Sequence, residues 1–129
     1  MKKNIIIAGS TGAIGREFTR FYSDDSNVEK IVTLSRKKID SGHKKIQSIE
    51  VDYSNEKSFE NLEKISELEF ISTIIIATGM LHRDKIKPEK SIDDINSESL
   101  EKVFKINVYG PILLVKKLLP LIKKSQGVK

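Results

Sequence analysis

The sequence contains no cysteine and no tryptophan, and its two histidines stand apart from one another. Without cysteine the chain forms no disulfide, carries no thiolate nucleophile and offers no thiolate to a metal. His43 and His82 fall in expected loops without a paired acidic cluster, so no metal site is expected. The absence of cysteine is also consistent with a reducing compartment.

Long apolar runs and clustered aromatic residues are missing too. The runs 5–8 and 74–77 are far shorter than the roughly 20 residues that a membrane-spanning helix needs, and no signal-peptide core begins the chain. The net charge is +5, but the lysines are scattered and aromatic residues make up 6% of the chain. We therefore expect a cytoplasmic protein with no membrane and no nucleic-acid partner, whose positive charge attracts anions such as nucleotides.

The residues that are present alternate between short β-branched runs and segments of helical periodicity. Because apolar strands that alternate with helices are typical of a parallel sheet covered on both faces, we predict an α/β, Rossmann-type, doubly wound fold. Right-handed crossovers favour the strand order 3-2-1-4 for about four strands. No linker divides the chain, so one dinucleotide-binding domain is expected over residues 1–129. Strands are predicted at 4–8, 30–35, 46–51 and 72–77, and helices at 13–22, 55–68 and 100–124.

Two of the predicted helices carry features that bear on their packing. Ile14, Phe18 and either Phe21 or Tyr22 share one face of the first helix. In the last helix, Gly110-Pro111 removes a backbone hydrogen bond and predicts a kink near residue 107.

A glycine-rich turn, Gly9-Ser10-Thr11-Gly12-Ala13-Ile14-Gly15, connects the first strand to the first helix. The first turn of a helix presents unpaired N–H groups and partial positive charge, which together favour a phosphate. The glycines allow a close approach, Gly15 allows the helix to pack on the strand, and Ser10 and Thr11 add hydroxyl donors. A P-loop is excluded because Gly15 is followed by Arg-Glu. The turn predicts a dinucleotide pyrophosphate site, and the alternative is a glycine-rich turn without a ligand.

The end of the second strand indicates which dinucleotide is bound. NAD-binding proteins usually place an acidic residue there to hold the ribose 2′-hydroxyl. This sequence has Ser35 and Arg36 instead, followed by two lysines. A guanidinium can bind a 2′-phosphate through two hydrogen bonds, so NADP is favoured over NAD. The alternative is a solvated basic loop.

These motifs resemble those of the short-chain dehydrogenase/reductase family over essentially the whole chain. The glycine-rich turn resembles the family's cofactor motif, with Ala8 in place of the usual Thr. The resemblance implies that Asp52 contacts the adenine and that neighbouring Tyr53 lies at the adenine end. It also implies that the Ala77-Thr78-Gly79 turn lines the cofactor and that Asn107 corresponds to the family's helical catalytic Asn. Residues 78–82 and 88–90 resemble the C-factor branch of the family.

The family's catalytic Ser and Tyr-x-x-x-Lys are not found at the positions that the resemblance requires. One such string, Tyr53 to Lys57, follows the third strand, far from where the hydride would be transferred. We therefore expect the cofactor-binding N-terminal portion of an oxidoreductase, truncated before its acid–base residues. The parent reaction would be NADPH-dependent carbonyl reduction or the reverse alcohol oxidation, with a small carbonyl or alcohol substrate only if a missing segment completes the site.

Two other interpretations stay open. The chain could be a non-catalytic, nucleotide-binding regulatory module, or an oligomerisation fragment whose cofactor site is vestigial. An exposed apolar edge on the fourth strand and the apolar residues of the last helix predict a homo-oligomer.

Overall fold

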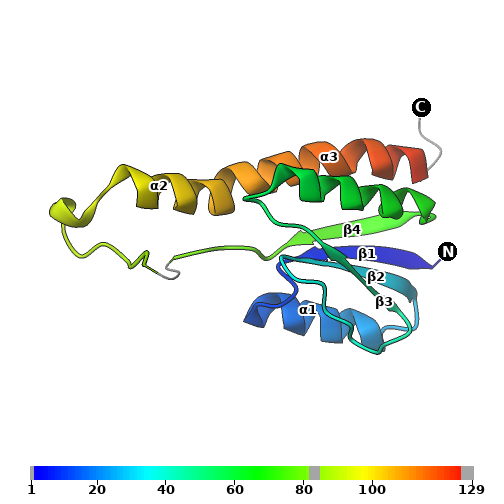
Figure 1. Ribbon diagram of the computed structural model, residues 1–129. Coiled ribbons are helices and arrows are strands. Elements are labelled where there is room, and N and C mark those ends of the chain that lie inside the picture. The colour runs from blue at the N-terminus through cyan, green and yellow to red at the C-terminus, as the bar shows by residue number, and fades with distance from the viewer. Residues whose placement is uncertain (1, 82–84, 126–129) are drawn as a thin grey trace.

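A four-stranded parallel sheet forms the frame of the molecule (Figure 1). The computed structural model describes residues 2–81 and 85–125. The strand order is β3-β2-β1-β4, which confirms the predicted Rossmann-type order. The strands are β1 (Lys3–Ala8), β2 (Val28–Ser35), β3 (Ile46–Glu50) and β4 (Ile71–Ile76).

Helices cover both faces of this sheet. Helix α1 (Ala13–Asp24) lies on one face, whereas η1 (Glu56–Glu67) and α3 (Gly110–Ser125) lie together on the other (Figure 1). Before α3, the chain forms η2 (Ile92–Asp94), α2 (Ser97–Phe104) and η3 (Lys105–Tyr109). None of the helices in the described ranges is long and apolar enough to cross a membrane.

The alternating side chains of β1 divide the core into two parts. Ile6 and Ala8 face the η1 and α3 side, and Ile5 and Ile7 face the α1 side. All four are buried, which explains why the strand reads as a continuous apolar run. The η1 and α3 side holds the larger cluster, whose helical members include Leu62, Ile65, Leu114 and Leu118.

The predicted helix at 55–68 is present as η1, a 3₁₀-helix over Glu56–Glu67. Its buried residues Phe59, Leu62 and Ile65 recur every three positions. A helix with three residues per turn places this spacing on one line, so the whole line can face the sheet. The Asn55 side chain accepts a hydrogen bond from the Lys57 backbone N–H and caps the start of η1.

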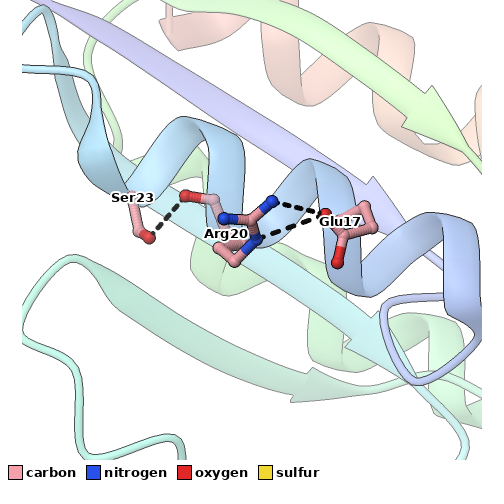
Figure 2. Close-up of polar contacts among 3 residues, drawn as sticks. All are labelled: Glu17, Arg20 and Ser23. Atoms are coloured by element: carbon pink, nitrogen blue, oxygen red, sulfur yellow. Dashed lines mark hydrogen bonds and ion pairs between the residues drawn. The ribbon is translucent and has the colours of Figure 1, made fainter.

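Helix α1 places most of its predicted apolar face toward solvent. Ile14 and Phe21 are each 66% exposed, and Phe18 is 38% exposed. The helix packs against the turn after β1 through buried Gly15, and Tyr22 packs on the Ile5 and Ile7 side of the core. On its polar side, Arg20 pairs with Glu17 at 2.8 Å, and the Ser23 hydroxyl donates to the Arg20 carbonyl (Figure 2).

The predicted helix at 100–124 begins earlier and is interrupted. Between α2 and α3, residues Lys105–Tyr109 form the π-helical segment η3, immediately before Gly110 and Pro111. In a regular α-helix, the proline ring would press against the carbonyl of residue 107 and leave it without a donor. A π-helical segment changes the hydrogen-bond spacing at that point. The sequence predicted a kink near residue 107, and the structure has a π-helical segment at that place.

Candidate functional site

A cleft of about 430 Å³ opens where the parallel strands end. In open α/β sheets, ligands bind at the carboxyl ends of the strands, beside the point where the strand order reverses. Here β1 lies between β2 and β4, so the loop after β1 stands at that point. Residues that the sequence singled out line the cleft from four loops: Gly9, Thr11, Gly12, Ser35, Arg36, Asp52, Tyr53, Ala77, Thr78 and Gly79.

The glycines of the turn lie where side chains would collide with backbone. Gly9 has a φ of +78°, and a Cβ there would lie 2.6 Å from the Ala77 carbonyl carbon. A Cβ on Gly15 would lie 2.1 Å from the Gly9 carbonyl oxygen. Gly12 is less crowded, because its nearest neighbour would be that same oxygen at 3.6 Å. Gly9 and Gly15 therefore hold the turn together, whereas Gly12 keeps side-chain atoms out of the cleft.

The remaining residues of the turn do not line the cleft. The Ser10 hydroxyl points toward the Leu34 carbonyl at 3.5 Å. Ala13 and Ile14 belong to the first turn of α1, where both are exposed, and Gly15 is buried beneath it. Gly12 is the N-cap residue of α1 and, as a glycine, makes no side-chain capping hydrogen bond.

Arg36 lies at the end of β2 and is exposed at the rim of the cleft. No acidic side chain among the described residues forms an ion pair with it, so its charge is available to an anion. Ser35 is buried, and its hydroxyl donates to the Lys37 carbonyl at 2.7 Å. The Ser35 hydroxyl proton is therefore used within the loop, and Arg36 is the exposed group at this end of the cleft.

Asp52 and Tyr53 follow β3. The Asp52 carboxylate accepts hydrogen bonds from the Ser54 backbone N–H at 2.8 Å and the Ser54 hydroxyl at 2.6 Å. Tyr53 is 8% exposed, and its hydroxyl lies 3.0 Å from the Thr78 hydroxyl. Burial raises the pKa of the Tyr53 phenol above its usual value, and the Thr78 hydrogen bond offsets part of that rise. The phenol is therefore uncharged near neutral pH.

Asn107 lies in η3 and does not line the cleft. Its side-chain carbonyl accepts from the Met80 N–H, and its amide donates to the Met80 carbonyl, both at 2.7 Å. Asn107 thereby ties η3 to the loop after β4. The string from Tyr53 to Lys57 does not bring those two side chains together, because the Tyr53 hydroxyl pairs with Thr78 and Lys57 is exposed.

Several residues that line the cleft were not singled out from the sequence. Leu34 lies near the end of β2 and Val51 directly follows β3, and these places were the signal that could have identified them. Ala8, which the resemblance gives only as a replacement for Thr, ends β1 and also lines the cleft. Met80, Leu81, Ile106 and Leu114 reach the cleft through tertiary packing and carry no such signal. His82 lies outside the described residues. Across the described part of the chain, no group of three or more His, Cys, Asp or Glu could hold a metal ion.

Comparisons with known proteins agree with this architecture. A family model described as short chain dehydrogenase matches residues 3–128. No curated protein sequence matches the chain. Among solved structures, the carbonyl reductase Sniffer of D. melanogaster is 20% identical, with a TM-score of 0.76 over 96% of this chain and 53% of the other.

Two further structures differ in the cofactor that they contain. The NADPH-bound carbonyl reductase from chicken fatty liver is 17% identical, with a TM-score of 0.78 over 95% of this chain and 49% of the other. A short chain dehydrogenase from Leptospira borgpetersenii with bound NAD+ is 22% identical, with a TM-score of 0.73 over 96% and 47%. The likeness shows a shared fold, and this chain spans about half the length of these proteins.

Proposed function

Because this chain belongs to the short chain dehydrogenase family, whose members are oxidoreductases that bind nicotinamide dinucleotides, we propose that its cleft binds NADP. One observation carries this proposal. The glycine-rich turn, Arg36 and Asp52 follow three neighbouring strands, and the fold brings all of them to one cleft.

The residues present fit the parts of an NADP molecule. Gly9 and Gly12 place no side chain in the cleft, so a pyrophosphate could approach the start of α1 there, beside Thr11. Arg36 offers the 2′-phosphate a guanidinium that forms no ion pair with the described acidic residues, and Asp52 lies beyond β3 for the adenine. When bound, the dinucleotide supplies or accepts a hydride, and this chain holds and orients it.

The choice between the two dinucleotides can be tested at Arg36. Arg36→Ala should weaken NADPH binding about tenfold or more and leave NADH binding nearly unchanged, because only NADPH carries the 2′-phosphate. Titration calorimetry measures both affinities. Lys44→Ala, a change of an exposed lysine that does not line the cleft, is the matched control. Equal losses for NADPH and NADH would contradict the assignment to the 2′-phosphate.

We further propose that residues 1–129 form a cofactor-binding domain, and that the acid–base residues of carbonyl reduction or alcohol oxidation are not among them. Asn107 matches the family's catalytic Asn in the resemblance, and here its side chain holds Met80. We expect this chain to bind NADPH without oxidising it in the presence of simple aldehydes and ketones. Absorbance at 340 nm follows the reaction, and turnover at rates usual for the family would contradict this part of the proposal.

A second candidate is a nucleotide-binding regulatory module without catalysis. The Tyr53 contact is compatible with it, because the tyrosine of the only Tyr-x-x-x-Lys string in the sequence is bonded to Thr78 and a module needs no acid–base pair. Sequencing the gene beyond the codon for Lys129 separates the two. An in-frame Ser and Tyr-x-x-x-Lys supports the enzyme, and a stop codon supports the module.

We place the protein in the cytoplasm, with the absence of cysteine as support. We also propose that it forms a homo-oligomer. The apolar residues that α2, η3 and α3 expose support this second proposal.

A further inference from the structure

The side chain of Tyr53 makes contacts with three other elements of the site. Its ring meets the Phe59 ring of η1 edge to face, with centroids 6.3 Å apart at 82°. Its hydroxyl lies 3.0 Å from the Thr78 hydroxyl, in the loop after β4. Its ring also lies against Gly110, the first residue of α3.

Gly110 provides the space that the Tyr53 ring occupies. A Cβ at Gly110 would lie 2.3 Å from Cδ2 of Tyr53, a distance that atoms of real side chains do not reach. Glycine is a poor helix former, and Gly110 is followed by Pro111, so this position does not favour the helix. The tyrosine ring gives a physical reason for the glycine, because any larger residue would displace the ring.

The loop that Tyr53 holds is a wall of the cleft. It includes Ala77, whose backbone is packed against Gly9, and Met80, whose backbone is held by Asn107. Thr78 lies between these two points. The Tyr53 hydroxyl therefore fixes the middle of a segment whose other parts touch the glycine-rich turn and η3.

We propose that Tyr53 is a positioning residue for dinucleotide binding, which acts through Thr78 and depends on the space left by Gly110. The inference rests on the proposed function. Tyr53 is 8% exposed, so it offers little surface to a ligand but sets the shape of the wall that the ligand meets. A wall that is already ordered loses less conformational freedom on binding, and the affinity is higher for that reason.

A double-mutant cycle tests the coupling between the two hydroxyl groups. Tyr53→Phe keeps the ring and removes the hydroxyl, and Thr78→Val removes the partner at nearly constant volume. Each should weaken NADPH binding about fivefold, the factor that corresponds to one hydrogen bond between uncharged groups. The double variant should be no weaker than either single variant. Tyr109→Phe, at an exposed tyrosine that does not line the cleft, is the control and should bind as the wild type does.

A second cycle tests the space at Gly110. Gly110→Ala should lower the urea midpoint of unfolding in the wild-type background, because the new methyl group meets the ring. In a Tyr53→Ala background the same change should cause no further loss. Equal losses in both backgrounds would show that the ring does not need this space and would overturn that part of the inference.

Hydrogen exchange separates failure of this inference from failure of the proposed function. If the wild type binds neither NADPH nor NADH, the proposed function fails. The positioning role is then judged from the amides of residues 78–81, which should exchange about fivefold faster in Tyr53→Phe while those of β1 stay unchanged. Unchanged exchange in that segment overturns the inference. If the wild type does bind, unchanged affinity in Tyr53→Phe, or losses that add in the double variant, overturns it.

Discussion

At the scale of single residues, the glycines of the turn serve different purposes, and substitution can separate them. Gly15→Ala places a methyl group 2.1 Å from the Gly9 carbonyl oxygen, so backbone must move. We expect the free energy of unfolding, measured by urea denaturation, to fall by about 2 kcal/mol, within the usual range for overpacking.

Gly12→Ala is the matched change in the same turn. Its methyl group would lie 3.6 Å from that oxygen, an ordinary contact, so stability should change by less than about 1 kcal/mol. The methyl group faces the cleft, however, and NADPH binding should weaken. Equal losses of stability in Gly12→Ala and Gly15→Ala would contradict this division of roles.

The phenol of Tyr53 makes stability depend on alkaline pH. Burial raises its pKa in the folded protein, and the Thr78 hydrogen bond offsets only part of this. The unfolded chain therefore ionises Tyr53 first. The stability that follows from the raised pKa of Tyr53 is fully present below the pKa of the unfolded chain, about 10, and is lost as pH rises through the pKa of the folded protein. Relative to Tyr53→Phe, the wild type should lose stability in urea denaturation over the range above about pH 10, where the unfolded chain ionises first. A constant difference between the two proteins over that range would contradict the shift.

Single residues of the site were predictable where their position in a motif gave them a role. Gly9 and Arg36 directly follow strands, Asp52 comes two residues after β3, and the carboxyl ends of parallel strands meet at one edge. The contact of Tyr53 with Thr78 and Gly110 follows no such rule. It depends on how η1, α3 and the loop after β4 pack, which periodicity and spacing do not encode.

At the scale of elements, α3 stabilises the sheet through one line of buried leucines. Leu118 is fully buried in the larger core cluster, whereas neighbouring Leu119 is 48% exposed. Leu118→Ala should lower the free energy of unfolding by about 2–5 kcal/mol, because it removes buried methyl groups and leaves a cavity. Leu119→Ala should cost less than about 1 kcal/mol. Urea denaturation measures both, and similar costs would mean that α3 is not docked as described.

The sequence predicted the helices and strands themselves better than it predicted which of their apolar faces are buried. β1 is a continuous apolar run because both faces of the sheet are covered there, and the spacing of three in η1 matches its 3₁₀ geometry. The apolar spacing of Ile14, Phe18 and Phe21 correctly indicated a helix. Periodicity shows that a helix has an apolar face, but the arrangement of the whole sheet decides whether anything packs against it.

At the scale of the whole molecule, burial is uneven. The α3 and η1 side holds most of the core, and the outer surface of α2, η3 and α3 still exposes large apolar side chains. Exposed apolar clusters on a small domain favour association. These side chains are Leu100, Phe104, Val108, Tyr109, Ile112 and Leu119.

We propose that the homo-oligomer forms through this surface. Phe104 and Ile112 are 47% and 61% exposed, so replacing both with lysine should leave the core intact and place charge in the interface. We expect the wild type to sediment as a dimer at micromolar concentration, and Phe104→Lys/Ile112→Lys to sediment as a monomer with an unchanged urea midpoint. Ile14→Lys, on exposed α1 across the sheet, is the control and should remain dimeric. Dissociation by Ile14→Lys alone would move the interface to α1, and a monomeric wild type would exclude the homo-oligomer. The lysine variants report on the interface because burying a charged side chain in an apolar contact is costly, so two copies separate where the lysine would be buried.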